Sequence, residues 1–106
     1  MLKITVFIVL FAFGLFFTGC EVSPDATFRV SYIKYGDYYG YPPTDPEKYK
    51  YGEVAIAKYQ GAIYKEGYTF KNWNTSPHGD STPYKVGEEI IVNKDIFLYV
   101  IWTPDN

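Results

Sequence analysis

An uncharged run from Ile4 to Phe17 ends shortly before Cys20, the only cysteine of the chain, and this boundary limits how much of the sequence can form a domain. The run has 14 residues, which suits a secretory signal and falls short of the about 20 residues that a membrane span needs. Removing residues 1–19 from 106 leaves 87 residues, enough for one compact domain. The sequence therefore predicts a signal-peptide helix within 1–19, a lipidated tether over 20–25 and a domain over 26–104.

The residues that precede the cysteine, Thr18 and Gly19, are small, and the stretch resembles a bacterial lipobox. That resemblance implies cleavage between Gly19 and Cys20, a diacylglyceryl group on the Cys20 sulfur and an acyl group on the new amine. These acyl chains would anchor the protein to a membrane, since each buried methylene contributes about 0.8 kcal/mol to membrane binding. We expect a protein of the bacterial cell envelope that faces the periplasm or the cell exterior. Two alternatives are an ordinary signal peptide that leaves a free thiol and an uncleaved N-terminal anchor helix.

The composition limits both the partners that the protein can bind and the residues that can fill its core. The formal net charge is −2, and acidic and basic residues are interspersed without a basic cluster. Nucleic-acid binding depends on clustered Lys and Arg, so we do not expect a nucleic-acid partner. A single cysteine cannot form a disulfide within the chain, and a domain of this size has a small core. We expect aromatic rings to fill that core, because all 12 tyrosines and both tryptophans follow residue 19.

The pattern of the remaining chain is mostly that of short strands. Phe28, Val30 and Tyr32 alternate with polar residues, which predicts a half-buried strand. The segments "YKYGEVAIA" at 49–57 and "YKVGEEIIV" at 84–92 each place a glycine turn before an apolar run, so we interpret them as two turns that lead into strands. The run 96–102 is apolar on both faces, as in a central strand. Residues 58–66 have room for a single helical turn.

The segment from 66 to 102 resembles the internalin B-repeat family, also called the Listeria-Bacteroides repeat. Its "EGYTFKNW" stretch, the later glycine and the closing "LYVIW" follow that pattern, and the similarity extends back to Phe28. The resemblance implies an α+β, mostly β domain, β-grasp-like with a reduced helix, of the kind found on bacterial surface proteins. It implies adhesion or partner contact without catalysis. The matching positions are Gly67, Tyr68, Phe70, Trp73, Gly87, Leu98, Tyr99 and Trp102.

The chain departs from the family pattern at two places that affect the fold. Asn72 stands where the family has glycine, and asparagine tolerates left-handed backbone conformations. We expect a bulge here, which would let Phe70 and Trp73 face one core despite their odd spacing. Val100 and Ile101 replace an alanine and a polar residue, so we expect a more apolar outer face on the last strand.

Few residues suggest catalysis or metal binding. His78 has only Asp80 nearby in its loop, which is too little for a zinc site or a catalytic triad. Glu88 and Glu89 are neighbours on an expected strand and would point to opposite faces. We therefore expect no enzyme activity, no catalytic residue, no metal site and no cofactor.

The loop "YGDYYGYPP", residues 35–43, is the candidate binding feature. Tyr38, Tyr39 and Tyr41 would offer rigid, amphipathic contact area to a protein or glycan ligand. Alternatively, these rings fold back to cover a small domain. The sequence thus favours a lipid-anchored, non-enzymatic binding or adhesion module. The alternative is a structural envelope lipoprotein or spacer without a discrete ligand site.

Overall fold

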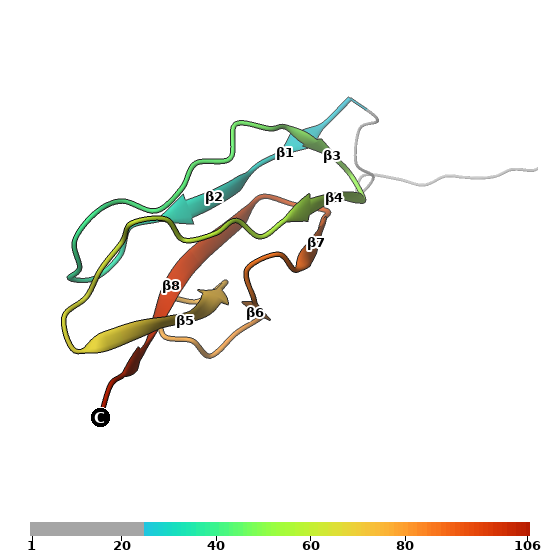
Figure 1. The fold of residues 1–106 in the computed structure, drawn as a ribbon. Helices are drawn as coiled ribbons and strands as arrows, with labels where there is room; N and C mark the ends of the chain where they lie inside the picture. Colours follow the sequence, from blue (N-terminus) through green and yellow to red (C-terminus); the bar gives the residue numbers. More distant parts are fainter. Residues whose placement is uncertain (1–24) are drawn as a thin grey trace, which may run out of the picture.

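The computed structural model describes residues 25–106, and the expected signal peptide and Cys20 lie outside this part (Figure 1). Residues 25–106 are built of strands and contain no helix. The prediction of a helical turn between residues 58 and 66 is therefore wrong. That segment holds a turn at Gly61 and a bridge at Tyr64 instead. The strands are β1 (Thr27–Phe28), β2 (Val30–Ile33), β3 (Tyr49–Lys50), β4 (Glu53–Ile56), β5 (Tyr68–Asn74), β6 (Pro83–Tyr84), β7 (Glu89–Val92) and β8 (Ile96–Pro104).

The largest sheet has the order β2-β8-β5-β6, with β8 paired on both sides. β8 runs parallel to β2, with Val30 opposite Ile96, and antiparallel to β5. Its alternate residues Leu98 and Val100 are buried, and Phe97 between the buried positions is exposed. The central strand expected over 96–102 is therefore confirmed. Val100, however, lies on the inner face, so only Ile101 adds to the apolar character of the outer face.

A bulge interrupts β5 where the sequence predicts one. Phe70 lies opposite Trp102 and Asn72 opposite Ile101, so Lys71 is the extra residue. An extra residue reverses the alternation of the side chains that follow it, so Trp73 points to the same face as Phe70. The rings of Phe70 and Trp73 consequently meet edge to face, with centroids 5.3 Å apart.

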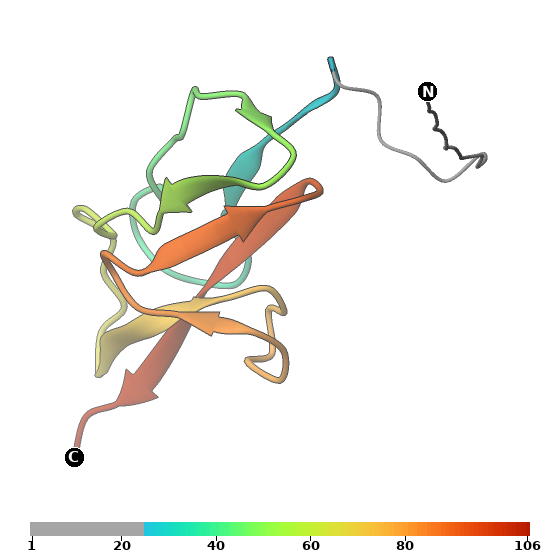
Figure 2. The same cartoon turned by 90° about the vertical axis from the view of Figure 1, so that its right-hand side faces the viewer.

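The two similar segments of the sequence form the second layer of the fold and pair with each other. β4 and β7 are antiparallel, with Val54 opposite Ile91 (Figure 2). Each is preceded by the same turn: the Lys50 N–H donates to Glu53 Oε1 at 2.8 Å, and the Lys85 N–H donates to Glu88 Oε1 at 2.9 Å. The glycine between them has a φ of 86° or 87°, which favours glycine strongly. The likeness of the two segments therefore reflects shared turn chemistry.

The core lies between the inner faces of these two sheets, and it is less aromatic than expected. Aliphatic residues make up most of the fully buried side chains, together with Trp73. Most tyrosines remain at the surface because the hydroxyl retains its water contacts there while the ring covers apolar neighbours. The fully buried large side chains are Trp73, Ile90, Leu98, Val30 and Val92.

Trp73 connects the layers through polar as well as apolar contacts. Its Nε1–H donates to the Lys58 carbonyl at 2.8 Å, and its ring meets that of Tyr32 at 4.7 Å. The Tyr32 hydroxyl accepts a hydrogen bond from the Lys58 N–H at 2.9 Å. The backbone of Lys58 is thus held by two aromatic side chains of the core, through its N–H by Tyr32 and through its carbonyl by Trp73. Burial raises the pKa of Tyr32, as expected for a phenol within a core.

Two adjacent isoleucines of β7 provide a test of this core. Ile90 is 0% exposed and Ile91 is 64% exposed. We expect Ile90→Ala to lower the free energy of unfolding by about 2–5 kcal/mol, because it removes buried methyl groups and leaves a cavity. Ile91→Ala, the matched control, should cost less than about 1 kcal/mol. Urea unfolding followed by tryptophan fluorescence measures both; equal losses would contradict the assignment of the two faces.

Candidate binding surface

The structure divides the three tyrosines of the candidate loop. Tyr38 is 7% exposed, whereas Tyr39 and Tyr41 are 70% and 81% exposed. The two interpretations of the loop therefore each hold for part of it: one ring covers the domain, and two face solvent. Only Tyr39 and Tyr41 remain available for contact with a partner.

Tyr38 belongs to the core. Its ring lies 5.4 Å from that of Trp102, and burial raises the pKa of its hydroxyl group. That hydroxyl is buried and makes no hydrogen bond to any other residue of 25–106. Tyr38 therefore holds the loop against the end of β8 and does not present a contact surface.

Lys34 fixes the path of the loop. Its Nζ donates to the carbonyls of Tyr38 and Gly40, at 2.6 Å and 2.5 Å. The same ammonium lies 4.2 Å from the ring centroid of Tyr38 and 4.9 Å from that of Tyr41. An ammonium over an aromatic face contributes about 0.5–1 kcal/mol at exposed sites. One side chain thus binds the backbone of the loop and positions an exposed ring.

The connection between β4 and β5, residues 57–67, is bonded to the loop 35–43. Tyr39 and Tyr64 exchange backbone hydrogen bonds of 2.8 Å and 3.0 Å, and their rings stack with centroids 6.2 Å apart. Gly40, with a φ of +85°, lies so close that a Cβ would stand 3.3 Å from the Ala62 carbonyl oxygen. Sequence reasoning missed Tyr64, which is 55% exposed, although "AIYKEGY" shows it close to the family motif.

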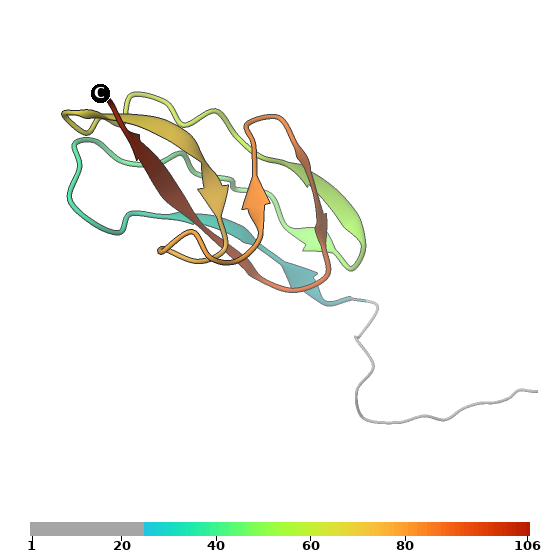
Figure 3. The ribbon, with the colours of Figure 1, turned by 90° about the horizontal axis from the view of Figure 1, so that it is seen from below.

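We name Tyr39, Tyr41 and Tyr64 the tyrosine end. Figures 1 and 3 show the two loops that carry these residues at one end of the domain, together with the C-terminus, and the start of β1 at the other. The backbone that carries these rings is held by the bonds between Tyr39 and Tyr64 and by Lys34, so ordering the loops costs little conformational entropy when a partner binds. The arrangement suits recognition.

The comparison with known families identifies the family. A family model described as the Listeria-Bacteroides repeat domain matches residues 28–100. The chain belongs to this family. The match begins at Phe28, as the sequence resemblance indicated. No curated protein and no solved structure matches the chain significantly.

The motif residues of the repeat are mostly structural in this chain. Trp73 and Leu98 are fully buried, and Phe70 and Trp102 pack against the core. Gly67 and Gly87 occupy turns with φ of 82° and 87°. The exposed tyrosines of the loop 35–43 lie within the matched residues but outside these motif positions.

The remaining polar candidates do not form a reactive cluster. His78 is exposed, and its ring lies 6.3 Å from that of Tyr35. A hydrogen bond from the Ser76 side chain lowers the pKa of Asp80, with a smaller contribution from His78. Glu88 caps the turn before β7. Within residues 25–106, no three His, Cys, Asp or Glu side chains are grouped as metal ligands would be, and no helix could cross a membrane.

The role of Lys34 can be tested by hydrogen exchange. Lys34→Met keeps the apolar stem and loses both carbonyl contacts, so the Tyr39 and Tyr64 amides should exchange about tenfold faster, equivalent to about 1.4 kcal/mol of local stability. The Leu98 amide should change little. Lys48→Met, at an exposed lysine, is the control. Unchanged protection at Tyr39 would show that Lys34 does not hold the loop.

Proposed function

We propose that this protein is a lipid-anchored component of the bacterial cell envelope, and that its repeat domain is a non-enzymatic binding module. The repeat family is typical of bacterial surface proteins. The observation that carries the binding role is the tyrosine end, where three exposed rings are fixed by Lys34 and by the bridge between Tyr39 and Tyr64. The parallel pairing of β2 with β8 supports a helix-free relative of the β-grasp fold.

The anchor proposal rests on Cys20 and the small residue Gly19 before it. β1 begins at Thr27, so only a short segment separates the lipidated cysteine from the domain. The tyrosine end lies at the opposite end of the domain from β1 (Figure 1). An anchor at Cys20 would therefore leave the tyrosine end turned away from the membrane, towards partners in the periplasm or outside the cell.

A protein is the partner class that this surface fits best. Tyrosine is enriched in protein interfaces because it adds a large amphipathic area with few torsions to order. A glycan ligand of the tyrosine end is the alternative. A spacer or structural lipoprotein without a ligand remains the second candidate function, and it is favoured by the position of β1 and the end of β8 at opposite ends of the domain.

The partner surface is tested by a triple variant, Tyr39→Ala, Tyr41→Ala and Tyr64→Ala. Envelope proteins cross-linked to the full-length protein in native cells should fall at least about tenfold, since the loss of central tyrosines from an interface costs about 2 kcal/mol or more. Tyr51→Ala with Tyr59→Ala, at two other exposed tyrosines, is the matched control. Equal cross-linking by both variants, with the fold intact, would favour the spacer function.

The anchor is tested separately at Cys20. Cys20→Ser should abolish incorporation of labelled palmitate and either release the protein from membranes or leave an unprocessed precursor, because serine lacks the sulfur that accepts the lipid. Membrane fractionation and intact-mass analysis measure this. A wild-type protein that carries no lipid on Cys20 in native cells would contradict the anchor while leaving the tyrosine end to be judged on its own.

A further inference from the structure

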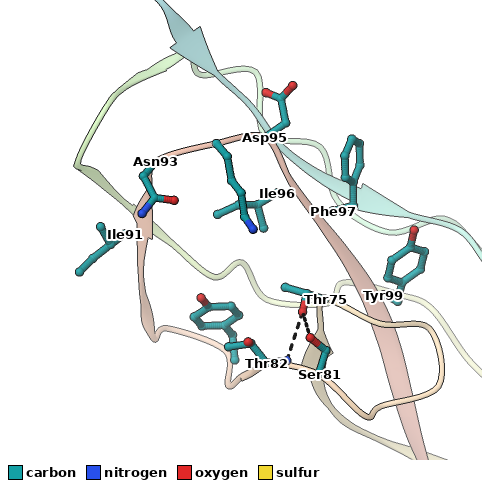
Figure 4. Close-up of a pocket in the computed structure, with 11 residues that line it drawn as sticks. Thr75, Ser81, Thr82, Ile91, Asn93, Asp95, Ile96, Phe97 and Tyr99 are labelled. Atoms are coloured by element: carbon teal, nitrogen blue, oxygen red, sulfur yellow. Dashed lines mark hydrogen bonds between the residues drawn. The ribbon is translucent and has the colours of Figure 1, made fainter. Parts of the chain in front are cut away.

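A hollow of about 550 Å³ lies where the main sheet is incomplete, away from the tyrosine end. β5 ends at Asn74, opposite Tyr99, whereas β8 begins three residues earlier at Ile96. The first residues of β8 therefore pair with β2 on one side only. The space that β5 would otherwise fill is bordered by the loop before β6, the turn between β7 and β8, and β8 itself (Figure 4).

Asn74 keeps this space open. Its buried side-chain oxygen accepts hydrogen bonds from the N–H groups of Ser76 and Ser81, at 2.9 Å and 3.2 Å. These bonds turn the chain out of the sheet directly after β5. The loop is closed by Thr75, whose hydroxyl donates to that of Ser81 at 2.8 Å. The hollow is thus built by a satisfied polar network that is not expected to collapse.

The lining has the chemistry of a site for a polar ligand with nonpolar ring faces. Figure 4 shows Asn93 on one side of the hollow and the hydroxyl-bearing residues Thr75, Ser81 and Thr82 on another. The Thr82 hydroxyl, the Asn93 amide and the Lys94 ammonium form no hydrogen bond to any residue of 25–106. Donors and acceptors therefore remain available on several sides. The rings of Tyr84 and Tyr99 also line the hollow, and both are half-buried.

We propose that this hollow binds a neutral carbohydrate of one or two sugar rings. Its volume falls within the about 300–1,000 Å³ of small-ligand sites. Sugar hydroxyls match amide and hydroxyl partners, and the C–H faces of a sugar pack on aromatic rings. Lys94 is balanced by the adjacent Asp95, so the lining carries no net charge that would select an ionic ligand. The inference goes beyond the partner proposed for the tyrosine end and does not depend on it.

An extended peptide fits the hollow less well than a sugar. The Ile96 N–H donates to the Arg29 carbonyl, on the β2 side of β8. Because successive residues of a strand direct their backbone groups to opposite sides, Phe97 directs its own towards the hollow, and Leu98 again faces β2. On the hollow side of β8, an added strand could therefore pair only with the backbone groups of Phe97. One residue is too few for a stable pairing.

The experiment uses saturation-transfer NMR on the full-length protein in a detergent without a sugar headgroup. The probes are cellobiose, N,N′-diacetylchitobiose, maltose and lactose at millimolar concentration. We expect saturation transfer to at least one of them from the wild-type protein. The double variant Thr82→Val with Asn93→Ala removes two polar groups from opposite sides of the hollow and should weaken that binding at least tenfold.

Two controls make the outcome specific. Thr103→Val with Asn106→Ala repeats the same changes at exposed positions near the C-terminus and should bind as the wild type does. The triple alanine variant of the tyrosine end should also retain binding. Near-ultraviolet circular dichroism verifies the fold of each variant. The proposal is overturned if no disaccharide receives saturation or if binding survives in the hollow variant. Binding that survives there and is lost in the tyrosine-end variant would instead place a glycan at the tyrosine end.

Discussion

The burial of Trp73 is the constraint on which the rest of the domain depends. Its ring is fully buried between two sheets that share no backbone pairing, and it contacts Tyr32 from one strand and Phe70 from its own. Its indole N–H reaches the Lys58 carbonyl, so the connection after β4 is held to the main sheet. The bulge at Lys71 makes this possible, because without an extra residue Phe70 and Trp73 would point to opposite faces.

With the core held in this way, the two candidate sites arise from two different breaks in regular pairing. At one end, the long connection from β2 to β3 is fixed by Lys34 and by the bridge to Tyr64, and this leaves tyrosine rings exposed on a well-ordered backbone. Beside the first residues of β8, where β5 has ended, Asn74 turns the chain out of the sheet and leaves a polar hollow. Both sites rest on side-chain-to-backbone hydrogen bonds, which set loop conformation without covering the groups that face solvent.

The position of the tyrosines reflects their amphipathic character. A small domain cannot bury many phenols, because each hydroxyl that leaves water needs a new partner. Tyr32 meets this need by accepting from the Lys58 N–H, and Tyr49 by donating to the buried Asp45 carboxylate at 2.7 Å. Burial, together with this hydrogen bond and the charge of Asp45, raises the pKa of Tyr49 well above its ordinary value. Tyr38 is an exception, since its buried hydroxyl makes no hydrogen bond within residues 25–106, but most tyrosines without such partners stay outside, where they are available to other molecules.

Local signals in the sequence were enough to predict the longer strands, two of the turns and the family. Alternation located β2, a continuous apolar run located β8, and the Lys-x-Gly-Glu pattern located the turns before β4 and β7. The spacing of Phe70 and Trp73 indicated a bulge. These signals all depend on residues close together in the chain. Folding is what places Tyr38 in the core and Tyr39 and Tyr41 on the surface, brings Tyr64 beside them, and opens a hollow beside β8. These outcomes depend on how distant segments are placed, such as Tyr38 against Trp102 and Tyr39 beside Tyr64, and local periodicity carries no information about such placement.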